Sequence, residues 1–159
     1  MPRSICDLSD DHPQQVQVGE PIFRDFGSRQ SFHGAITTVR CFEDNVLLRQ
    51  ILSTPGQDRV MIVDGGGSLK RALVGDKLAA LMISNGWAGI VVNGAVRDVE
   101  NLREMAVAVR ALSICPSKPA QNGTGERDVV VRFAGVTFRP GDWLYADENG
   151  LIVSETPLS

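Results

Sequence analysis

Two uninterrupted apolar runs with a helical segment between them constrain the fold of this chain most. The first run is VMIV (60–63) and the second lies in AGIVVNG (88–94). Between them, DKLAALMISNG (76–86) repeats apolar residues at helical spacing, with Asp76 as the expected N-cap and Gly86 as the expected end. A buried strand, a helix and a second buried strand in succession are typical of a parallel βαβ unit with a right-handed crossover.

The segments on either side of this unit add further elements. Residues 31–44 alternate with β-branched side chains and predict either a strand pair or one long bent strand. Residues 45–54 have the apolar spacing of a helix, and DVENLREMAVAV (98–109) begins another helix. The tail, 128–155, is rich in strand formers, with turn signals at 139–142 and 147–150. The sequence therefore predicts an α/β fold with a mixed sheet, in a single domain spanning 1–159.

Charge and hydropathy exclude several classes of partner. The 159 residues carry 16 basic and 19 acidic side chains, a net charge near −3 without blocks of one sign, which gives no reason to expect nucleic-acid binding. No apolar run approaches the length of a membrane span, and the N-terminus lacks the apolar core of a signal peptide. We expect a cytoplasmic protein that binds neither membranes nor nucleic acid directly.

The spacing of residues supports neither cysteine-based nor serine-based catalysis. The three cysteines, Cys6, Cys41 and Cys115, lie far apart, and only two histidines, His12 and His33, are present. This pattern matches neither a zinc site nor a Cys-His nucleophile, so the cysteines are interpreted as small buried groups or bystanders. No G-x-S-x-G motif occurs, which removes the usual signature of a serine hydrolase.

Three stretches fall at the ends of predicted strands, where ligands gather in open α/β sheets. Gly75–Leu78 opens a helix whose first N–H groups would attract an anion, although on local grounds alone Asp76 as a simple helix cap is the better explanation. Arg97-Asp98 offers a guanidinium for an oxyanion and a hard oxygen ligand, or else a surface ion pair with Asp98 as a helix cap.

The third stretch is the glycine run at 64–68, DGGGS, which matches no phosphate-binding motif. A tight turn, or a close approach of another backbone, explains the glycines better. Lys70 and Arg71 follow this run and are interpreted as a solvated face, with assistance to an anionic substrate as the alternative.

These segments together resemble the family that contains the regulator of ribonuclease activity A (RraA) and the class II 4-hydroxy-4-methyl-2-oxoglutarate aldolases. The likeness covers nearly the whole chain and includes EPIFRDFG, VDGGGSLKRALVGDKLA, NGAVRD and FAGVTFRPGDWLYADENGLIVSE. Metal-dependent members carry an Asp, twenty residues, and then Arg-Asp, which here is Asp76 followed by Arg97-Asp98. The resemblance implies a swivelling β/β/α-type domain, a homotrimer, and sites near the subunit boundaries.

The resemblance also implies a role for each residue of the motif. Asp98 would hold a divalent cation, Mg²⁺ or Mn²⁺, and Asp76 would position water next to it. The backbone N–H groups of Gly75, Asp76, Lys77 and Leu78 would bind the carboxylate of a small 2-oxo acid. Arg97 would stabilise the negative charge that gathers on the keto oxygen. No residue is assigned as the base for aldol cleavage; Glu100 is near in sequence but helix direction turns it away.

Two hypotheses of different class follow, and a third is weaker. The first is a metal-dependent lyase that cleaves 4-hydroxy-4-methyl-2-oxoglutarate and decarboxylates oxaloacetate through one pyruvate enolate. The second is a regulator that binds a ribonuclease E-type endonuclease or a helicase and restrains RNA decay. Retention of Asp98 favours the first, since a regulator does not need the Arg-Asp pair. The third is a phosphate-binding module built on the triple glycine.

Overall fold

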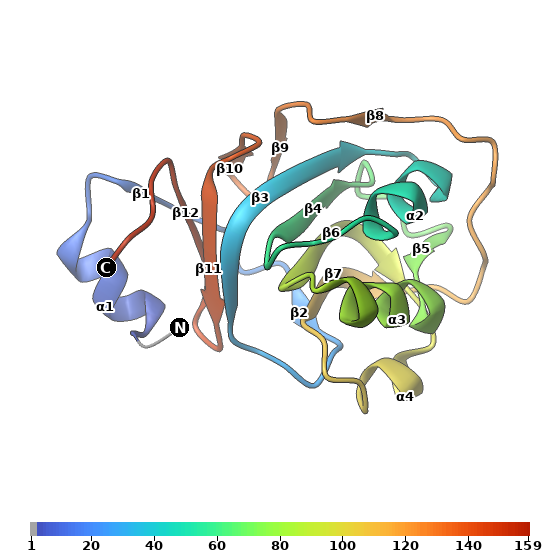
Figure 1. Ribbon diagram of the computed structural model, residues 1–159, viewed down its shortest axis with the longest axis horizontal. Helices are drawn as coiled ribbons and strands as arrows, with labels where there is room; N and C mark the ends of the chain where they lie inside the picture. Colours follow the sequence, from blue (N-terminus) through green and yellow to red (C-terminus); the bar gives the residue numbers. More distant parts are fainter. Residues whose placement is uncertain (1–2) are drawn as a thin grey trace.

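Ten strands within residues 3–159 form one mixed sheet in the computed structural model of the protein, and two further strands form a hairpin (Figure 1). The helices are α1 (Ile5–Asp11), α2 (Val46–Leu52), α3 (Asp76–Asn85) and α4 (Val99–Leu102). The strands are β1 (Val16–Val18), β2 (Arg24–Asp25), β3 (Phe32–Arg40), β4 (Val60–Asp64), β5 (Ala72–Val74), β6 (Gly89–Val96), β7 (Val109–Ile114), β8 (Glu126–Arg127), β9 (Val131–Phe133), β10 (Val136–Phe138), β11 (Trp143–Asp147) and β12 (Gly150–Ser154). The α/β fold with a mixed sheet is confirmed.

Strand β3 connects the antiparallel and parallel parts of the sheet. Residues 32–35 pair antiparallel with β11, whereas residues 36–40 pair parallel with β4. The sheet order is β1-β12-β11-β3-β4-β6-β7-β2, so strands from both ends of the chain extend its antiparallel side. Of the two alternatives for residues 31–44, one long strand is therefore correct.

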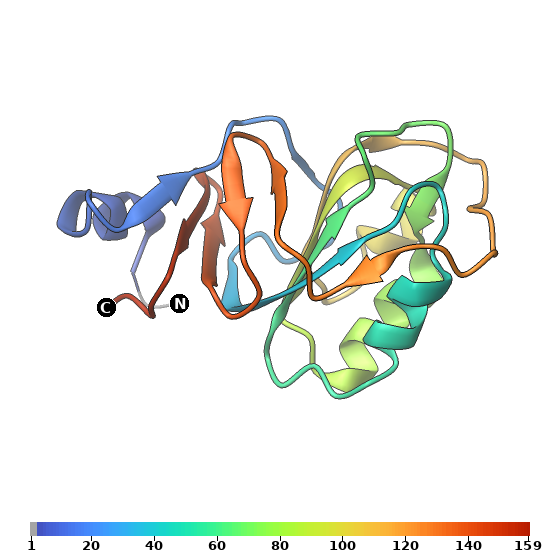
Figure 2. The ribbon, with the colours of Figure 1, turned by 90° about the horizontal axis from the view of Figure 1, so that it is seen from above.

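Strands β4 and β6 form the buried centre, and they pair directly and parallel, with α3 between them in the chain. Met61 and Val63 of β4 pack in one apolar cluster with α2 and α3, whereas Val60 and Ile62 pack in a second cluster with β10, β11 and β12. Successive side chains of a strand point to opposite faces, so helices cover one face of the parallel strands and other strands cover the second face (Figure 2). Burial on both faces explains why residues 60–63 of β4 are all apolar.

Two helix predictions need correction at their boundaries. Gly75, in extended conformation, is the N-cap of α3, and Asp76 is the first helical residue, so the predicted cap at Asp76 is wrong by one position. Gly86 ends α3 in the left-handed conformation, as predicted. The helix expected from 98 to 109 is a single turn, because Val109 already belongs to β7 between β6 and β2. Strand pairing and burial override the helical spacing there.

Hydropathy and cysteine burial complete the description. No helix in residues 3–159 combines the length and the apolar character needed to cross a membrane. Cys41 and Cys115 are buried, whereas Cys6 lies on the surface. Burial raises the pKa of the Cys41 thiol to about 12, so this cysteine is a neutral part of the core.

Candidate active site

Strand β5 brings the two charged segments of the sequence together. Val74 of β5 pairs in parallel with Val96 of β6, and the Arg97 N–H donates to the Val74 carbonyl at 2.9 Å. Because parallel strands end at the same edge of a sheet, the residues that follow Val74 and Val96 emerge side by side. Gly75 and Asp76 are therefore next to Arg97 and Asp98, although twenty residues separate Asp76 from Arg97 in the chain.

A cleft of about 330 Å³ opens where these segments meet. Its walls come from four parts of the chain, and every residue predicted for the site lines it. The lining residues are Asn45, Arg49, Ala72, Leu73, Val74, Gly75, Asp76, Lys77, Leu78, Arg97, Asp98, Lys118, Pro119 and Gln121. We call this hollow the Asp98 cleft.

The Asp98 carboxylate lies against the start of α3. Its Oδ2 accepts a hydrogen bond from the backbone N–H of Asp76 at 3.1 Å, and it makes no capping bond to its own helix α4. A Cβ atom at position 75 would lie 2.5 Å from this oxygen, so only glycine leaves room for the carboxylate. Asp98 therefore occupies the N-cap position of α4, as predicted, but its carboxylate bonds to α3 and does not cap the helix that follows it.

Asp98 also has an unusual backbone, with φ of 59° in the left-handed region. Asp tolerates this conformation better than most residues, but it still stores strain. The bond to Asp76 and the backbone bonds of α4 hold the residue there, with the Asn101 and Leu102 N–H groups donating to its carbonyl. Oδ1 receives no hydrogen bond from residues 3–159, which leaves it free for a ligand.

The Asp76 carboxylate is held by the neighbouring helix turn. It accepts a hydrogen bond from Nδ2 of Asn101 at 2.9 Å, and the residue is half-buried. The first N–H of α3 is already bonded to Asp98, but those of Lys77 and Leu78 have no partner within a helix of this geometry. The start of α3 therefore retains donors that suit an anion.

Arg97 keeps most of its hydrogen-bonding capacity for a ligand. Its side chain makes one long bond within the described chain, from Nη1 to the Pro116 carbonyl at 3.4 Å, and it forms no ion pair there. The surface ion pair with Asp98 considered from the sequence is thus absent in residues 3–159. A half-buried guanidinium with free donors is suited to bind a carboxylate or an oxyanion.

Sequence patterns missed the wall formed by Asn45 and by the segment between β7 and β8, which contributes Lys118, Pro119 and Gln121. Buried Asp44 fixes this segment, because its carboxylate accepts the backbone N–H groups of Asn122 and Gly123 at 2.6 and 3.2 Å. No local signal marks these positions, since their approach to the cleft depends on the path of the whole chain.

The charges that line the Asp98 cleft favour an anionic ligand. Two carboxylates, Asp76 and Asp98, face four cationic side chains. These cations are Arg49, Lys77, Arg97 and Lys118. The surplus of positive charge in a hollow of this size indicates a small, negatively charged substrate.

The donor set of the cleft fits some metal ions and excludes others. In residues 3–159, no three His, Cys, Asp or Glu side chains gather in an arrangement suited to a metal. A zinc site closed by three or four protein ligands is therefore not formed there. Asp98, with one free carboxylate oxygen, fits Mg²⁺ or Mn²⁺, because Mg²⁺ is typically held by one or two carboxylates and keeps several waters.

The remaining predicted candidates lie outside the Asp98 cleft. In the glycine run, Asp64 Oδ1 accepts from the Gly66 N–H at 2.9 Å and from Asn93 Nδ2 at 3.2 Å, and Gly66 has φ of 69°. These contacts describe a tight turn beside the backbone of β6, in agreement with the preferred interpretation. Lys70 and Glu100 are exposed and do not line the cleft.

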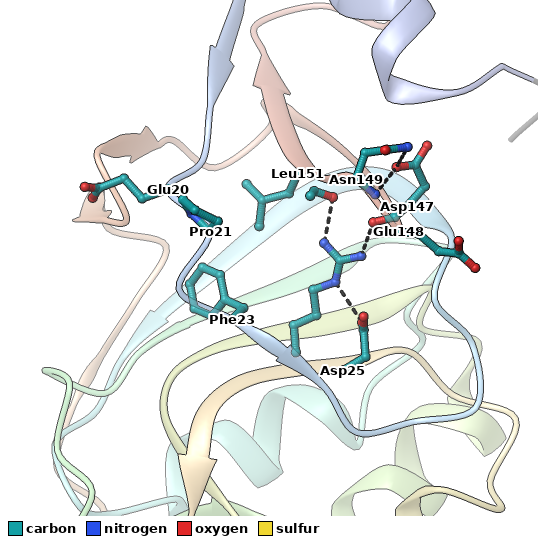
Figure 3. Close-up of a pocket in the computed structure, with 10 residues that line it drawn as sticks. Glu20, Pro21, Phe23, Asp25, Asp147, Glu148, Asn149 and Leu151 are labelled. Carbon is teal, nitrogen blue, oxygen red and sulfur yellow. Dashed lines mark hydrogen bonds and ion pairs between the residues drawn. The ribbon is translucent and has the colours of Figure 1, made fainter.

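A second, smaller hollow of about 150 Å³ surrounds Arg110 (Figure 3). The guanidinium is bonded to the Asp25 carboxylate at 2.9 Å and to the carbonyl oxygens of Gln30, Asp147 and Gly150. Because these acceptors take most of its donors, the buried cation has little capacity left for a ligand. This hollow is a structural junction, and the Asp98 cleft remains the better candidate for a site.

The pattern of the RraA-like family (Aldolase/RraA) matches residues 4–153. The chain belongs to this family. A protein of Alkalilimnicola ehrlichii named "Putative 4-hydroxy-4-methyl-2-oxoglutarate aldolase" is 54% identical over 152 residues, which is 96% of this chain and 94% of the relative. A relative of the same name from Xanthomonas campestris pv. campestris is 53% identical, over 96% of this chain and 92% of its own length.

Solved structures of the family share the fold but carry different names. The RNA-processing inhibitor RraA from Thermus thermophilis is 45% identical, with a TM-score of 0.96 over 100% of this chain and 96% of its own. An S-adenosylmethionine: 2-dimethylmenaquinone methyltransferase from Geobacillus kaustophilus HTA426 is 40% identical, with a TM-score of 0.94 over 98% and 96% of the two chains. The recognition of the family from its motifs is confirmed. Because these related proteins carry different names, the names alone do not determine the function of this chain. The chemistry of the Asp98 cleft has to decide between the candidate functions.

Proposed function

We propose that this RraA-like protein is a divalent-metal-dependent lyase acting on small 2-oxo acids. It would cleave 4-hydroxy-4-methyl-2-oxoglutarate to pyruvate and decarboxylate oxaloacetate. The observation that carries the proposal is the meeting of Asp76, Arg97 and Asp98 in one positively charged cleft at the start of α3. The names of the relatives from Alkalilimnicola and Xanthomonas support the aldolase reaction.

The chain's own groups suit the pyruvyl end of such a substrate. The N–H groups of Lys77 and Leu78 bind its carboxylate, at the positive end of the α3 dipole. Arg97 donates to the keto oxygen, on which negative charge gathers as the adjacent carbon–carbon bond breaks. The guanidinium forms no ion pair in the described chain, so it does not have to break one in order to reach the substrate.

Asp98 is the residue that would hold Mg²⁺ or Mn²⁺, through the carboxylate oxygen that no described residue bonds. The bound cation supplies Lewis acidity, which stabilises negative charge on the keto oxygen. Asp76, with its carboxylate fixed by Asn101, orients water beside Asp98. Gly75 keeps the carboxylate of Asp98 close to α3, because it places no side chain between them.

Both reactions make the same intermediate and differ in what leaves. In the retro-aldol reaction the C3–C4 bond breaks and its electron pair forms the enolate of pyruvate. The 4-hydroxyl gives its proton to water, and C4 becomes the carbonyl carbon of a second pyruvate. In the decarboxylation the electron pair of the bond to the carboxylate forms the same enolate, and CO₂ departs. Arg97 faces the same oxyanion in both, so one cleft serves both reactions.

Pyruvate release from oxaloacetate in the presence of Mg²⁺ or Mn²⁺ tests this proposal. The purified protein should exceed the rate given by the metal alone, and Asp98→Ala should remove the excess. Asp10→Ala, at an exposed position of α1, is the matched control and should retain the wild-type rate. Equal rates with and without the wild-type protein would refute the lyase.

A second function has independent support in the structure of the RNA-processing inhibitor RraA, whose fold matches this chain over its full length. The protein would then bind a ribonuclease E-type endonuclease as a partner and restrain RNA cleavage, with a homotrimer presenting the binding surface. A pull-down with the endonuclease and an RNA-cleavage assay test this function. No binding at micromolar concentration would argue strongly against it.

A further inference from the structure

Four Asn-Gly pairs occur in the sequence, and at each of them the asparagine side chain can close on the next backbone nitrogen and lose ammonia. Glycine hinders this ring closure least, because it has no Cβ beside the attacking nitrogen. The asparagines of these pairs are Asn85, Asn93, Asn122 and Asn149. Since the ring forms only when the side chain can turn, the fold decides which pair reacts.

Three of these asparagines are held by their side-chain amides. Nδ2 of Asn85 donates to the last carbonyl of α2 at 3.0 Å. In strand β6, Nδ2 of Asn93 donates to Oδ1 of Asp64 at 3.2 Å. In the tight turn between β11 and β12, Nδ2 of Asn149 donates to Oδ1 of Asp147 at 3.2 Å. Each of these amides has to break its bond before it can close a ring.

Asn122 differs from the other three. Its side chain is exposed and makes no hydrogen bond with residues 3–159, so it is free to turn. The next residue, Gly123, has φ of 79° and lies between β7 and β8, outside any helix or strand. Its N–H donates to Oδ2 of Asp44 at 3.2 Å. The nitrogen that has to attack therefore directs its hydrogen at a carboxylate, which can accept the proton.

We propose that Asn122-Gly123 is a site of spontaneous deamidation, and that this reaction loosens the wall of the Asp98 cleft. The Gly123 nitrogen bonds to Cγ of Asn122, and the Cγ–Nδ2 bond breaks. The hydrogen of the attacking nitrogen passes to Asp44 and on to water, while the departing nitrogen takes a proton from water and leaves as ammonia. Water then opens the ring at either carbonyl, which gives aspartate or isoaspartate at position 122.

Both products disturb Asp44, whose carboxylate fixes this part of the chain. A carboxylate at position 122 is a second negative charge beside Asp44, because the backbone N–H of the same residue bonds to Asp44 at 2.6 Å. In isoaspartate the main chain also gains a carbon atom, which displaces the Gly123 N–H from its acceptor. Lys118 and Gln121 line the Asp98 cleft from this segment, so its release weakens the binding of an anionic substrate.

Peptide mass spectrometry on the folded wild-type protein tests the site. The protein is incubated in neutral buffer for several weeks and cleaved with trypsin, which leaves the Asn-Gly pairs in the peptides 78–97, 111–127 and 133–159. We expect the mass gain of an amide that becomes an acid, together with isoaspartate, to arise in 111–127 before the other two peptides change. In urea, where no side chain is held, this difference should largely disappear. No gain in 111–127, or equal gains in all three peptides of the folded protein, would overturn the site.

Two matched variants connect the modification with the cleft. Asn122→Gln keeps an amide, but glutamine closes its larger ring far more slowly, so this variant should not react. Asn149→Gln is the control at the other exposed Asn-Gly pair. We expect incubation to raise KM for oxaloacetate several-fold in the wild type and in Asn149→Gln, and to leave Asn122→Gln unchanged. No rise in the modified wild type, or the same rise in all three proteins, would overturn the effect on the cleft.

The effect on turnover rests on the proposed lyase function, whereas the modification does not. A freshly purified protein that releases no pyruvate from oxaloacetate would refute the lyase, and the free energy of unfolding would then report on the segment. Incubation should lower this free energy in the wild type and in Asn149→Gln, but not in Asn122→Gln. A constant free energy of unfolding in the modified wild type would show that the segment is not loosened.

Discussion

At the scale of single residues, Gly75 is the position at which one atom decides the geometry of the cleft. A Cβ there would lie 2.5 Å from Oδ2 of Asp98 and 3.4 Å from Cγ of Arg97. We predict that Gly75→Ala displaces the carboxylate and lowers kcat/KM for oxaloacetate by about 10²-fold, comparable to the loss of one stabilising donor. Steady-state kinetics with saturating Mg²⁺ measure the effect.

Gly86→Ala, at the other end of the same helix, is the control for that prediction. Gly86 has φ of 75°, and nothing lies within 4 Å of a Cβ added there. The strain of a left-handed alanine should lower the free energy of unfolding by about 1 kcal/mol and leave kcat/KM unchanged. Wild-type activity in Gly75→Ala would contradict the account of this close approach.

The buried thiol of Cys41 leads to a prediction about how the free energy of unfolding depends on pH in the alkaline range. In the unfolded chain the thiol has its ordinary pKa of 9.0, whereas burial raises the pKa to about 12 in the folded chain. Between these values the unfolded state binds fewer protons than the folded state, so the free energy of unfolding falls as the pH rises from about 9 towards 12. Below pH 9 both states keep the proton, and this contribution is constant.

Urea denaturation of the wild type and of Cys41→Ala from pH 8 to pH 11 measures this contribution. Because every other group is common to the two proteins, only the difference between the two curves reports on Cys41. We expect the stability gap between the two proteins to narrow as the pH rises above 9. Curves that stay parallel over this range would show that the thiol ionises equally in both states.

At the scale of elements, the sequence predicted those helices and strands that local residue patterns determine. The apolar run at 60–63 is buried on both faces, and α3 follows it with a clear apolar stripe, so the βαβ unit was recognisable. Strand β5 was not, because three residues before a glycine carry too little pattern, and only the pairing of Val74 with Val96 makes them a strand. This pairing also brings together Gly75–Leu78 and Arg97-Asp98, the two predicted parts of the site.

The segment between β7 and β8 is held in part by the side chain of Asp44. The Asp44 carboxylate accepts N–H groups of Val46, Asn122 and Gly123, and the residue is 2% exposed. We predict that Asp44→Ala lowers the free energy of unfolding by about 3 kcal/mol, because three bonds to a charged acceptor are lost. Chemical denaturation measures this loss.

The same substitution should reach the cleft, since the released segment carries Lys118 and Gln121. We expect a several-fold rise in KM for oxaloacetate with a smaller change in kcat. Asp44→Asn keeps one acceptor oxygen and should show roughly half the loss of stability. A loss below about 1 kcal/mol in Asp44→Ala would mean that the segment is held elsewhere.

At the scale of the whole molecule, the alternation of elements predicted the mixed sheet, but the contacts between its antiparallel and parallel parts were beyond sequence patterns. Arg110 of β7 shows why. It resembles a polar residue at the edge of a strand, yet it is 4% exposed and bonds to β2 and to the turn between β11 and β12 (Figure 3). Its four acceptors come from positions 25, 30, 147 and 150, which only the folded chain brings together.

The hydrogen bonds of Arg110 lead to a prediction that concerns the stability of the protein and not its activity. Arg110→Leu removes the cation from Asp25 and leaves the Asp147 and Gly150 carbonyls without their donor, so we expect a loss of about 3 kcal/mol in the free energy of unfolding. Arg127→Leu breaks an exposed ion pair with Asp128 and should change stability by no more than about 0.5 kcal/mol. The ratio of the aldolase and decarboxylase activities should be the same in both variants, because neither arginine lines the Asp98 cleft. A change in that ratio for Arg110→Leu would mean that the two parts of the sheet set the shape of the cleft together.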